Sequence, residues 1–580
     1  MSTVREFPGG LAIEAMRYRL EVRSDKAMAW LSDENGVWAG LRLLAAVDTL
    51  DGPDETTEVG APEIERIGAT IRLRVRHGSS RWDSRTLVLD CHEDRIDTWV
   101  EVRGDGRITD VHLLSGRGAA AGFAMGTLPS TARFASVFSP NPADPARVVL
   151  PATECAVIGV TGDGQAGRGH WFFTPAPLCY AVSRARAADP AVPPEGAWLA
   201  FDLVTPVSDC TFTGWHYIAA DGGFGFRLDY EGHTAVDGEF RTPTLRIRPG
   251  LTDPYAALRG QAPRAVREIP DWWREPMFCG WGAQCHLAAV RGGRAAEQST
   301  QDDYDAFLAH LARHGVHPGT VVVDDKWQRH YSAADPDPRR WPDLSGWIAR
   351  RHADRQKVLL WWKAWDPEGA PASFCVRDAS GRAMALDPEH PGAVELMTEA
   401  VHRMLSPDGL DADGLKVDFT ANTPTGSSLL HHGSRWGVAL LHELLAVLYR
   451  AAKQAKPDAL VITQTPSPLF AEVTDAVRLN DMLRLDDPDP DRAPVVTQMR
   501  YRAAVVAAAC PELLVDTDDW CAPDLTSWRA YLAVKADLGV PALYYATHID
   551  RSGEALTTAD FAALRRSWAA YRTRHALPPR

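Results

Sequence analysis

GLKVDFT (residues 414–420) is a short apolar run that ends in polar side chains. A loop with proline and glycine follows it, and then a segment that repeats leucine at helical spacing, at Leu440, Leu441, Leu444 and Leu448. A strand-like run followed by an amphipathic helix is typical of one βα unit in a parallel sheet. This stretch therefore predicts that the second half of the chain is an α/β domain.

The same alternation recurs on both sides of this unit. Strand-like runs stand at 276–284, 319–327, 357–365, 459–466, 475–481, 512–520 and 540–550. The segments between them predict helices from about Thr300 to Gly315, around 394–404 and 495–508, from Asp524 to Gly539, and near 558–572. Eight βα units in succession predict a (β/α)8 TIM barrel, which we place at residues 276–575.

The first 250 residues have a different period. Apolar and polar residues alternate in short runs such as TIRLRVRHG (70–78), TLVLDC (86–91), WLAFDLV (198–204) and TPTLRIRP (242–249). This alternation is typical of antiparallel strands with one buried face. We therefore predict an N-terminal β-sandwich over 1–250 and a linker over 251–275 before the barrel.

The overall composition argues against several kinds of partner. The chain of 580 residues carries a formal net charge of -14, which disfavours nucleic acid and anionic membranes. No apolar run approaches the roughly 20 residues of a membrane-spanning helix, and the start MSTVREFPGG lacks the apolar core of a signal peptide, so we expect a cytoplasmic protein. Nine cysteines form no CxxC pair, so they signal neither a zinc site nor a redox site, and we expect buried reduced thiols. Assembly into a homo-oligomer is left open.

Polar residues collect at the predicted C-terminal ends of the barrel strands, where such barrels carry their active sites. They are Asp324, Asp325, Lys363, Asp366, Lys416, Asp418, Gln464, Arg478, Asp481, Asp516, Asp518, Asp519, His548 and Asp550, with Trp281, Trp327, Trp361, Trp362, Trp365 and Trp520 between them. A bowl of carboxylates and tryptophans suits glycosidic chemistry, which needs a carboxylate nucleophile and a second carboxylic acid. This chemistry implies no metal and no other cofactor. Helix capping stays open as the alternative role of Asp366, Asp516, Asp518 and Asp519.

Lys416 and Asp418 stand two residues apart on one predicted strand. Side chains alternate along a strand, so both can point into the mouth of the barrel. A nearby cation keeps a carboxylate ionised. Asp418 also precedes a loop with proline and glycine, which argues against a role as a helix cap.

Five motifs of the barrel resemble those of one enzyme clan. GLKVDFT resembles the nucleophile strand of the retaining α-galactosidase clan and of the related α-glucosidase family, with a Lys-x-Asp at Lys416 and Asp418. Four further stretches resemble the other motifs of that clan in order and spacing: FCGWGAQ (278–284), VVVDDKWQ (321–328), RWPDLSGWI (340–348) and VRLND (477–481). The most similar family is that of microbial α-galactosidases and raffinose-processing enzymes.

This resemblance implies a retaining α-glycosidase that hydrolyses terminal α-linked sugars, first of all α-galactosides, in an oligosaccharide or glycoside. It implies Asp418 as nucleophile and Asp481 as acid/base. It also implies substrate contacts from Asp324, Asp325, Lys416, Arg478, Trp281, Trp327 and Trp362. Open alternatives are an α-glucosidase, an α-xylosidase or a transglycosidase, and, in another class, a non-catalytic carbohydrate-binding protein.

Some features of the sequence leave the acid/base residue open or depart from the pattern of the family. Asp486 and Asp487 compete with Asp481 for the acid/base role, but their proline-rich surroundings predict a surface loop, so we choose Asp481. Lys326 stands where the family usually has glycine, which bears on the specificity for galactose. The chain stops shortly after the last predicted helix, so we expect the family's C-terminal β-domain to be absent.

Overall fold

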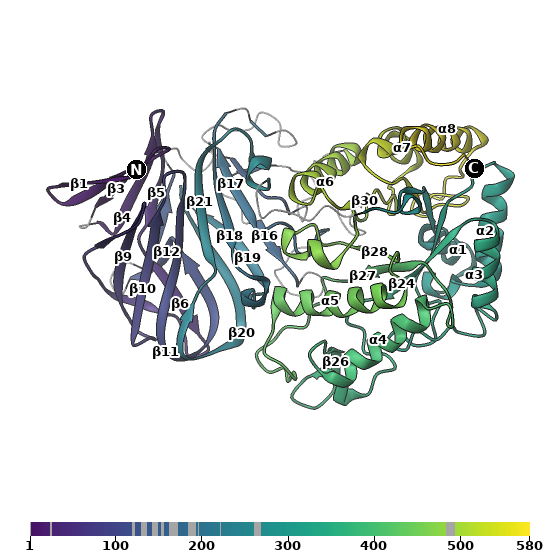
Figure 1. The fold of residues 1–580 in the computed structure, drawn as a ribbon, viewed down its shortest axis with the longest axis horizontal. Helices are drawn as coiled ribbons and strands as arrows, with labels where there is room; N and C mark the ends of the chain where they lie inside the picture. Colours follow the sequence, from purple (N-terminus) through teal and green to yellow (C-terminus); the bar gives the residue numbers. More distant parts are fainter. Residues whose placement is uncertain are drawn as a thin grey trace.

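The computed structural model describes residues 2–579 apart from 24–25, 119–121, 129–135, 142–148, 152–155, 162–171, 184–192, 195, 221, 260–267 and 483–493. The described chain forms two parts that lie side by side (Figure 1). A strand-rich part contains the N-terminus, and a barrel surrounded by helices contains the C-terminus.

The strand-rich part is one hydrogen-bonded network of strands. Its strands are β1 (Thr3–Phe7), β2 (Gly10–Glu14), β3 (Arg19–Arg23), β4 (Met28–Asp33), β5 (Gly36–Arg42), β6 (Ala45–Thr49), β7 (Glu55–Val59), β8 (Glu63–Ile67), β9 (Thr70–Ser79), β10 (Ser84–Cys91), β11 (Ile96–Leu113), β12 (Ser115–Gly118), β13 (Gly122–Thr127), β14 (Ser136–Phe138), β15 (Val149–Pro151), β16 (Ala156–Gly159), β17 (Cys179–Ser183), β18 (Trp198–Val204), β19 (Gly214–Ala220), β20 (Gly223–Arg241) and β21 (Thr244–Leu251). Buried and less buried residues alternate along β9, as its sequence predicts. A strand-rich N-terminal part is thus confirmed, while its layering as a sandwich stays a prediction.

Among the described residues, eight parallel strands form the barrel. They are β22 (Met277–Cys279), β23 (Thr320–Val323), β24 (Lys357–Lys363), β27 (Gly414–Asp418), β28 (Leu460–Thr463), β29 (Ala476–Arg478), β30 (Leu514–Asp516) and β31 (Ala542–Leu543). They pair in this order, β31 pairs with β22, and a parallel bridge between Asp516 and Val540 closes the ring. Each predicted run contains one of these strands, so the parallel barrel is confirmed.

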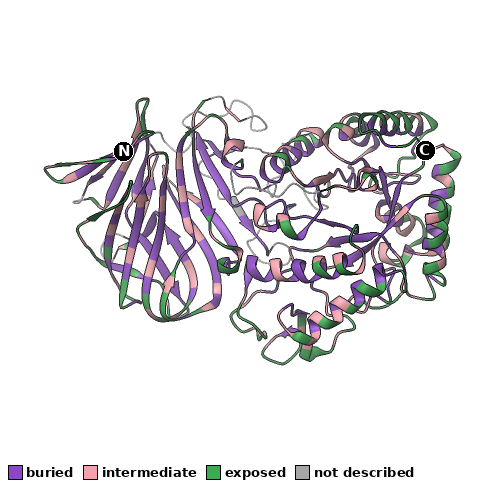
Figure 2. Cartoon of the chain, viewed as in Figure 1, coloured by how far each residue is buried: buried purple, intermediate pink, exposed green. Residues whose placement is uncertain are grey.

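In the described part of the chain, eight α-helices surround the barrel. They are α1 (Trp281–Arg291), α2 (Gln301–Arg313), α3 (Leu344–Ala353), α4 (Pro391–Leu405), α5 (Gly437–Ala455), α6 (Val495–Ala509), α7 (Leu525–Leu538) and α8 (Thr558–Arg574), and a hairpin of β25 (Cys375–Arg377) and β26 (Ala383–Leu386) follows β24. The strands are buried, whereas the helices keep exposed outer faces (Figure 2). No described helix is both long and apolar enough to cross a membrane.

The first barrel strand is shorter than its sequence predicts. The run 276–284 reads as one strand, but β22 ends at Cys279 and α1 begins at Trp281. Gly280 occupies the N-cap position, and no side chain caps this helix. Because the usual polar signal for a helix start is missing, the pattern of apolar residues runs on unbroken into the helix.

The strand-rich part caps a helix of the barrel. The first turn of α5 has backbone N–H groups that need acceptors from outside the helix. Val438 N donates to Phe212 O at 3.0 Å, and Ala439 N donates to Cys210 O at 2.9 Å. Gly437 has φ +54°, and a Cβ there would lie 1.9 Å from Phe212 O, so only glycine fits this contact.

Candidate active site

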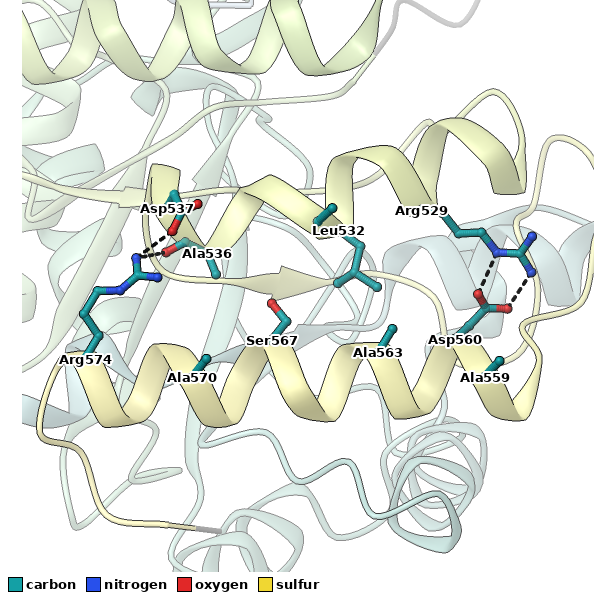
Figure 3. A pocket seen from close by; sticks show the side chains of 11 residues that line it. Arg529, Leu532, Ala536, Asp537, Ala559, Asp560, Ala563, Ser567, Ala570 and Arg574 are labelled. Atoms are coloured by element: carbon teal, nitrogen blue, oxygen red, sulfur yellow. Dashed lines mark hydrogen bonds and ion pairs between the residues drawn. The ribbon is translucent and has the colours of Figure 1, made fainter.

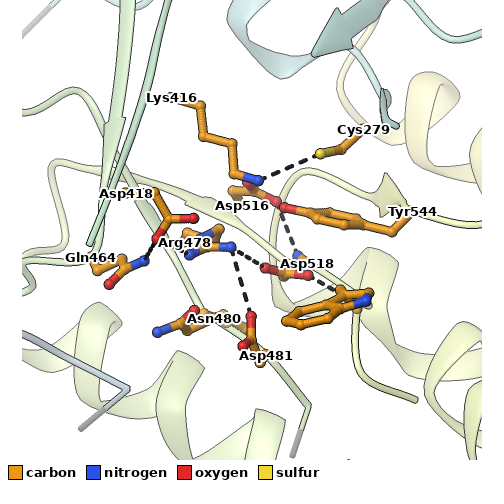
Figure 4. A network of polar contacts seen from close by, with 12 residues as sticks. Cys279, Lys416, Asp418, Gln464, Arg478, Asn480, Asp481, Asp516, Asp518 and Tyr544 are labelled. Atoms are coloured by element: carbon orange, nitrogen blue, oxygen red, sulfur yellow. Dashed lines mark hydrogen bonds and ion pairs between the residues drawn. The ribbon is translucent and has the colours of Figure 1, made fainter. Parts of the chain in front are cut away.

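The carboxylates predicted to act together meet around one arginine. Arg478, the last residue of β29, lies between Asp418 and Asp481 (Figure 4). Its Nη2 is 2.9 Å from Asp418 Oδ1, and its Nη1 is 3.8 Å from Asp481 Oδ1 and 3.1 Å from Asp518 Oδ2. One buried guanidinium thus holds the ends of three strands together.

Asp418, the last residue of β27, is held as an anion. Its Oδ1 accepts hydrogen bonds from Arg478, from Gln464 Nε2 and from the backbone of Phe419, and its Oδ2 accepts one from Trp361 Nε1 at 3.2 Å. Burial raises its pKa, but Arg478 and Lys416 outweigh burial, so the pKa lies below the usual value. The side chain is still 19% exposed, which leaves it open to a ligand.

Asp481 is shifted in the opposite direction. Burial raises its pKa to about 7, and the charges of Asp518 and Asp418 add to this effect while Arg478 opposes it. Its side chain is 27% exposed. Two neighbouring carboxyl groups with pKa values pushed apart are the electrostatic pattern of an anion beside a proton donor. Asp486 and Asp487, the competing pair, lie outside the described residues.

Asp324 and Lys416 form a buried pair beneath the mouth of the barrel. Lys416 Nζ lies 2.6 Å from Asp324 Oδ2, and Cys279 Sγ lies 3.0 Å from the same oxygen. Burial alone would lower the pKa of Lys416, but the nearby Asp324 and Cys279 raise it by more. The pKa therefore lies above the usual value, and this lysine stays charged. The other oxygen of Asp324 accepts a hydrogen bond from the backbone of Asp325 at 2.8 Å. Asp324 therefore holds Lys416 in place and is not itself presented to the mouth.

Asp325 is the member of the acid pair that is partly exposed. Tyr331 Oη donates to its Oδ1 at 2.8 Å. Burial raises the pKa of Asp325 to about 6, against the effect of Tyr331. Lys326 pairs with Glu368, and its Nζ lies 3.7 Å from the centre of the Tyr331 ring. Its backbone has φ +72°, which explains why glycine suits this position.

The three predicted tryptophans are placed differently from one another. Trp281 is partly exposed at the start of α1, with its ring 5.7 Å from that of Trp520. Trp327 and Trp362 are fully buried in the hydrophobic core, so the structure does not bring them to the carboxylates. Trp361 comes there instead, because it pairs in register with Lys416 and shares its face of the sheet.

Several contributors to the site carry no role in the resemblance. Trp361, Gln464 and Asp518 contact Asp418 or Arg478 directly. The polar residue Lys363 marks the inward face of its strand, so its spacing from Trp361 is a signal that sequence reasoning could have used. No comparable pattern marks Tyr331, which lies in a loop.

Helix capping, the alternative role of four of the aspartates, is not what they do in the described structure. These are Asp366, Asp516, Asp518 and Asp519. The N-cap of α7 is Asp524. Asp366 pairs with Lys363 at 2.7 Å, and Asp519 pairs with buried Lys535 at 2.7 Å. The carboxylate of Asp516 accepts a hydrogen bond from the backbone of Asp518 at 3.0 Å. These groups support the strand ends from within the polar network.

Left-handed backbone accompanies the candidate carboxylates. Phe419 follows Asp418 with φ +61°, Asn480 precedes Asp481 with φ +69°, and Lys326 follows Asp325. Residues other than glycine rarely adopt this conformation, which costs about 1–2 kcal/mol each. Strain of this kind is typical of functional sites, where the surrounding structure enforces it.

Other features of the molecule lie apart from this site. A groove of about 510 Å³ between α7 and α8 contains Arg529, Asp537, Asp560 and Arg574 and no strand-end carboxylate (Figure 3). In the described part of the chain, no three His, Cys, Asp or Glu side chains are grouped as ligands of a metal ion. The described cysteines are free thiols, buried except for half-buried Cys285.

Comparisons with known proteins identify the fold. No family model and no curated protein sequence matches this chain. It is similar to the solved structure of a GH31 family sulfoquinovosidase from E. rectale, with a TM-score of 0.61 and 10% identity over 99% of this chain and 83% of that one. It is also similar to an alpha-galactosidase from Thermus thermophilus in complex with stachyose (TM-score 0.51, 15% identity, 87% of this chain and 99% of that one). A cycloalternan-degrading enzyme from Trueperella pyogenes gives a TM-score of 0.53 and 12% identity over 92% of this chain and 80% of that one. The chain therefore has the fold that these glycoside hydrolases share.

Proposed function

We propose that this protein is a retaining α-glycosidase that acts through a covalent glycosyl-enzyme. The observation that carries the proposal is the pair of carboxyl groups on Arg478, with the pKa of Asp418 lowered and that of Asp481 raised to about 7. At neutral pH one is a carboxylate and the other is partly protonated. Retaining glycosidases need this combination of nucleophile and proton donor.

The residues take the following roles in the proposed reaction. Asp418 attacks the anomeric carbon with Oδ2, which accepts fewer hydrogen bonds than Oδ1 from the described residues. Asp481 gives its proton to the departing glycosidic oxygen. In the second step Asp481 takes a proton from water, and the water oxygen attacks the same carbon and releases Asp418.

Substrate contacts follow from exposure. Asp325 is proposed to accept hydrogen bonds from ring hydroxyls, and Trp281 to offer apolar surface to the sugar ring. Trp361 is buried and acts by donating a hydrogen bond to Asp418. Lys416 and Arg478 stabilise the anionic nucleophile. Asp324 acts by holding Lys416, because its oxygens are already occupied.

Terminal α-galactosides are the proposed substrates. The five sequence motifs and the likeness to an α-galactosidase fold along 99% of that chain support this choice. Lys326 is compatible with it, because Glu368 and the Tyr331 ring hold its ammonium group. A panel of nitrophenyl α-glycosides tests the choice: turnover of another sugar corrects the specificity, and turnover of none favours a carbohydrate-binding protein.

The nucleophile is tested with Asp418→Asn. The amide has nearly the same shape but does not attack the anomeric carbon, so turnover falls by at least about 1,000-fold. Azide restores product formation as a β-glycosyl azide, detected by mass spectrometry and NMR. A variant that keeps most of its activity, or azide rescue that yields the α-azide, contradicts the assignment.

A further inference from the structure

The segment that carries Asp481 has little regular structure of its own. β29 is three residues long, and the chain turns at Asn480 directly after it. Leu479 N donates to Asp516 O and Met482 N donates to Trp520 O, both at 2.9 Å. Asp481 itself lies between these two anchor points, so its position depends on what holds the turn.

Arg502 of α6 holds this turn from the outside. The side chain has no exposed surface, and its Nη1 donates to three successive carbonyls, Leu479 O at 2.8 Å, Asn480 O at 3.2 Å and Asp481 O at 2.6 Å. The left-handed conformation of Asn480 is part of the turn that brings these carbonyls together. In the described part of the chain, every side-chain hydrogen bond of Arg502 goes to this turn.

Phe172 of the strand-rich part closes the arrangement. Its ring centre lies 3.7 Å from the Arg502 guanidinium carbon, and its backbone oxygen accepts a hydrogen bond from Asn480 Nδ2 at 2.7 Å. The same residue therefore contacts both the arginine and the turn that the arginine binds. Thr174 N, two residues on, donates to Gln464 O at 2.9 Å, next to the amide that binds Asp418.

We infer that Arg502 is a positioning residue for the acid/base carboxyl of Asp481, with Phe172 as its cover. This inference rests on the proposed function. Among the described residues no carboxylate forms an ion pair with Arg502. Burying such an arginine costs free energy, and a core position of this kind would favour an apolar residue. Its three bonds to one turn instead fix the backbone from which Asp481 projects. A displacement of about 1 Å in such a group costs on the order of 100-fold in rate.

The test compares substrates that need the acid with substrates that do not. Arg502→Met keeps an unbranched apolar side chain but loses the guanidinium and its donors. With alkyl or natural α-glycosides, whose leaving groups must be protonated, we expect kcat/KM to fall by about 30- to 100-fold. With dinitrophenyl α-glycosides we expect a change of less than about 3-fold, because this leaving group departs without a proton. Arg502→Lys keeps a donor and should lie between wild type and Arg502→Met.

Arg500→Met, an exposed position on the same helix, is the matched control and should behave as wild type with both substrates. Equal losses with both substrates, or none, in Arg502→Met overturn the inference, since a purely structural role does not depend on the leaving group. If Arg502→Met does not fold, the same comparison in Arg502→Lys decides. Asp481→Ala is measured in parallel: if it lacks the leaving-group dependence, the acid/base assignment fails, whatever Arg502 does.

Discussion

At the scale of single residues, Arg478 accounts for how two aspartates differ. Arg478 forms close ion pairs with Asp418 at 2.9 Å and with Asp518 at 3.1 Å, whereas its nearest nitrogen lies 3.8 Å from Asp481. The pKa of Arg478 lies well above the usual value because, despite burial, the surrounding acids favour the charged form of its guanidinium. A fixed cation that is nearer one carboxylate than the other, together with burial, separates their pKa values.

The pH dependence of activity should report this separation. The pKa of Asp481 is about 7, so the proposed proton donor is protonated below that pH and loses its proton above it. The pKa of Asp418 is lowered, so the proposed nucleophile stays ionised through the neutral range. We expect kcat/KM for a nitrophenyl substrate to decline with a basic limb near pH 7, measured from pH 4 to 10.

Asp481→Ala provides the check on that assignment. It should remove the basic limb and leave a low activity that does not fall as the pH rises. A basic limb that survives unchanged in Asp481→Ala assigns the titration to another group.

At the scale of strands and helices, the two ends of the barrel use aspartate for different purposes. Asp413 immediately precedes β27, at the end opposite to Asp418. Its carboxylate accepts hydrogen bonds from Lys357 Nζ and Val358 N at 2.9 Å and contacts His352 Nε2 at 2.8 Å. Although burial raises its pKa, His352 and Lys357 lower it to about 2. This end of such barrels serves stability.

Asp413→Ala should therefore destabilise the protein and spare its chemistry. It removes a buried carboxylate and leaves its partners unpaired, which costs about 3 kcal/mol in urea unfolding, while kcat/KM of the folded variant stays within about 2-fold. The pKa of Asp413 is lowered on folding, so the stabilisation is present above about pH 4 and is lost as the pH falls toward 2. Asp354→Ala, an exposed acid at the end of α3, should change stability by less than about 0.5 kcal/mol. Equal effects of both changes would show that the buried network is not stabilising.

The strands of the barrel could be located from sequence because each is a buried apolar run between polar turns. The inward face of a strand was harder to assign, because the two adjacent tryptophans at 361 and 362 point to opposite faces. The spacing of Trp361 from Lys363 favours Trp361, and the pairing of Trp361 in register with Lys416 places it on the inward face. The shared position of Asp324 and Lys416 likewise depends on strands 92 residues apart in sequence. Arg502 carries no local signal at all, because the carbonyls it binds belong to another element.

At the scale of the whole molecule, the strand-rich part and the barrel are joined at the start of α5 and at Phe172. Besides the caps from Phe212 and Cys210, His233 stacks on Trp436 with ring centres 4.0 Å apart, and Gly426 N donates to His233 Nε2 at 2.7 Å. These contacts fix the loop that follows Asp418 between the strand-rich part and the barrel.

Gly437→Ala should weaken this joint. The added Cβ would meet Phe212 O at 1.9 Å and also strain a backbone with φ +54°, so we expect a loss of about 2–4 kcal/mol and a lower Tm. Gly553→Ala is the matched control, because Gly553 has φ +72° but nothing within 4 Å of a Cβ. It should lose only about 1 kcal/mol. Equal losses in thermal unfolding would mean that strain alone, and not the joint, limits stability at Gly437.

The bond between Asn480 and Phe172 joins residues 308 positions apart, and this separation sets an order in time. A ribosome releases the strand-rich part long before β29 exists, and N-terminal domains generally fold first during synthesis. The barrel then closes against a surface that is already formed, and the turn that carries Asp481 is among the last pieces to find its place. In each new molecule the proposed proton donor is thus in position only after synthesis has passed β29 and the barrel has closed.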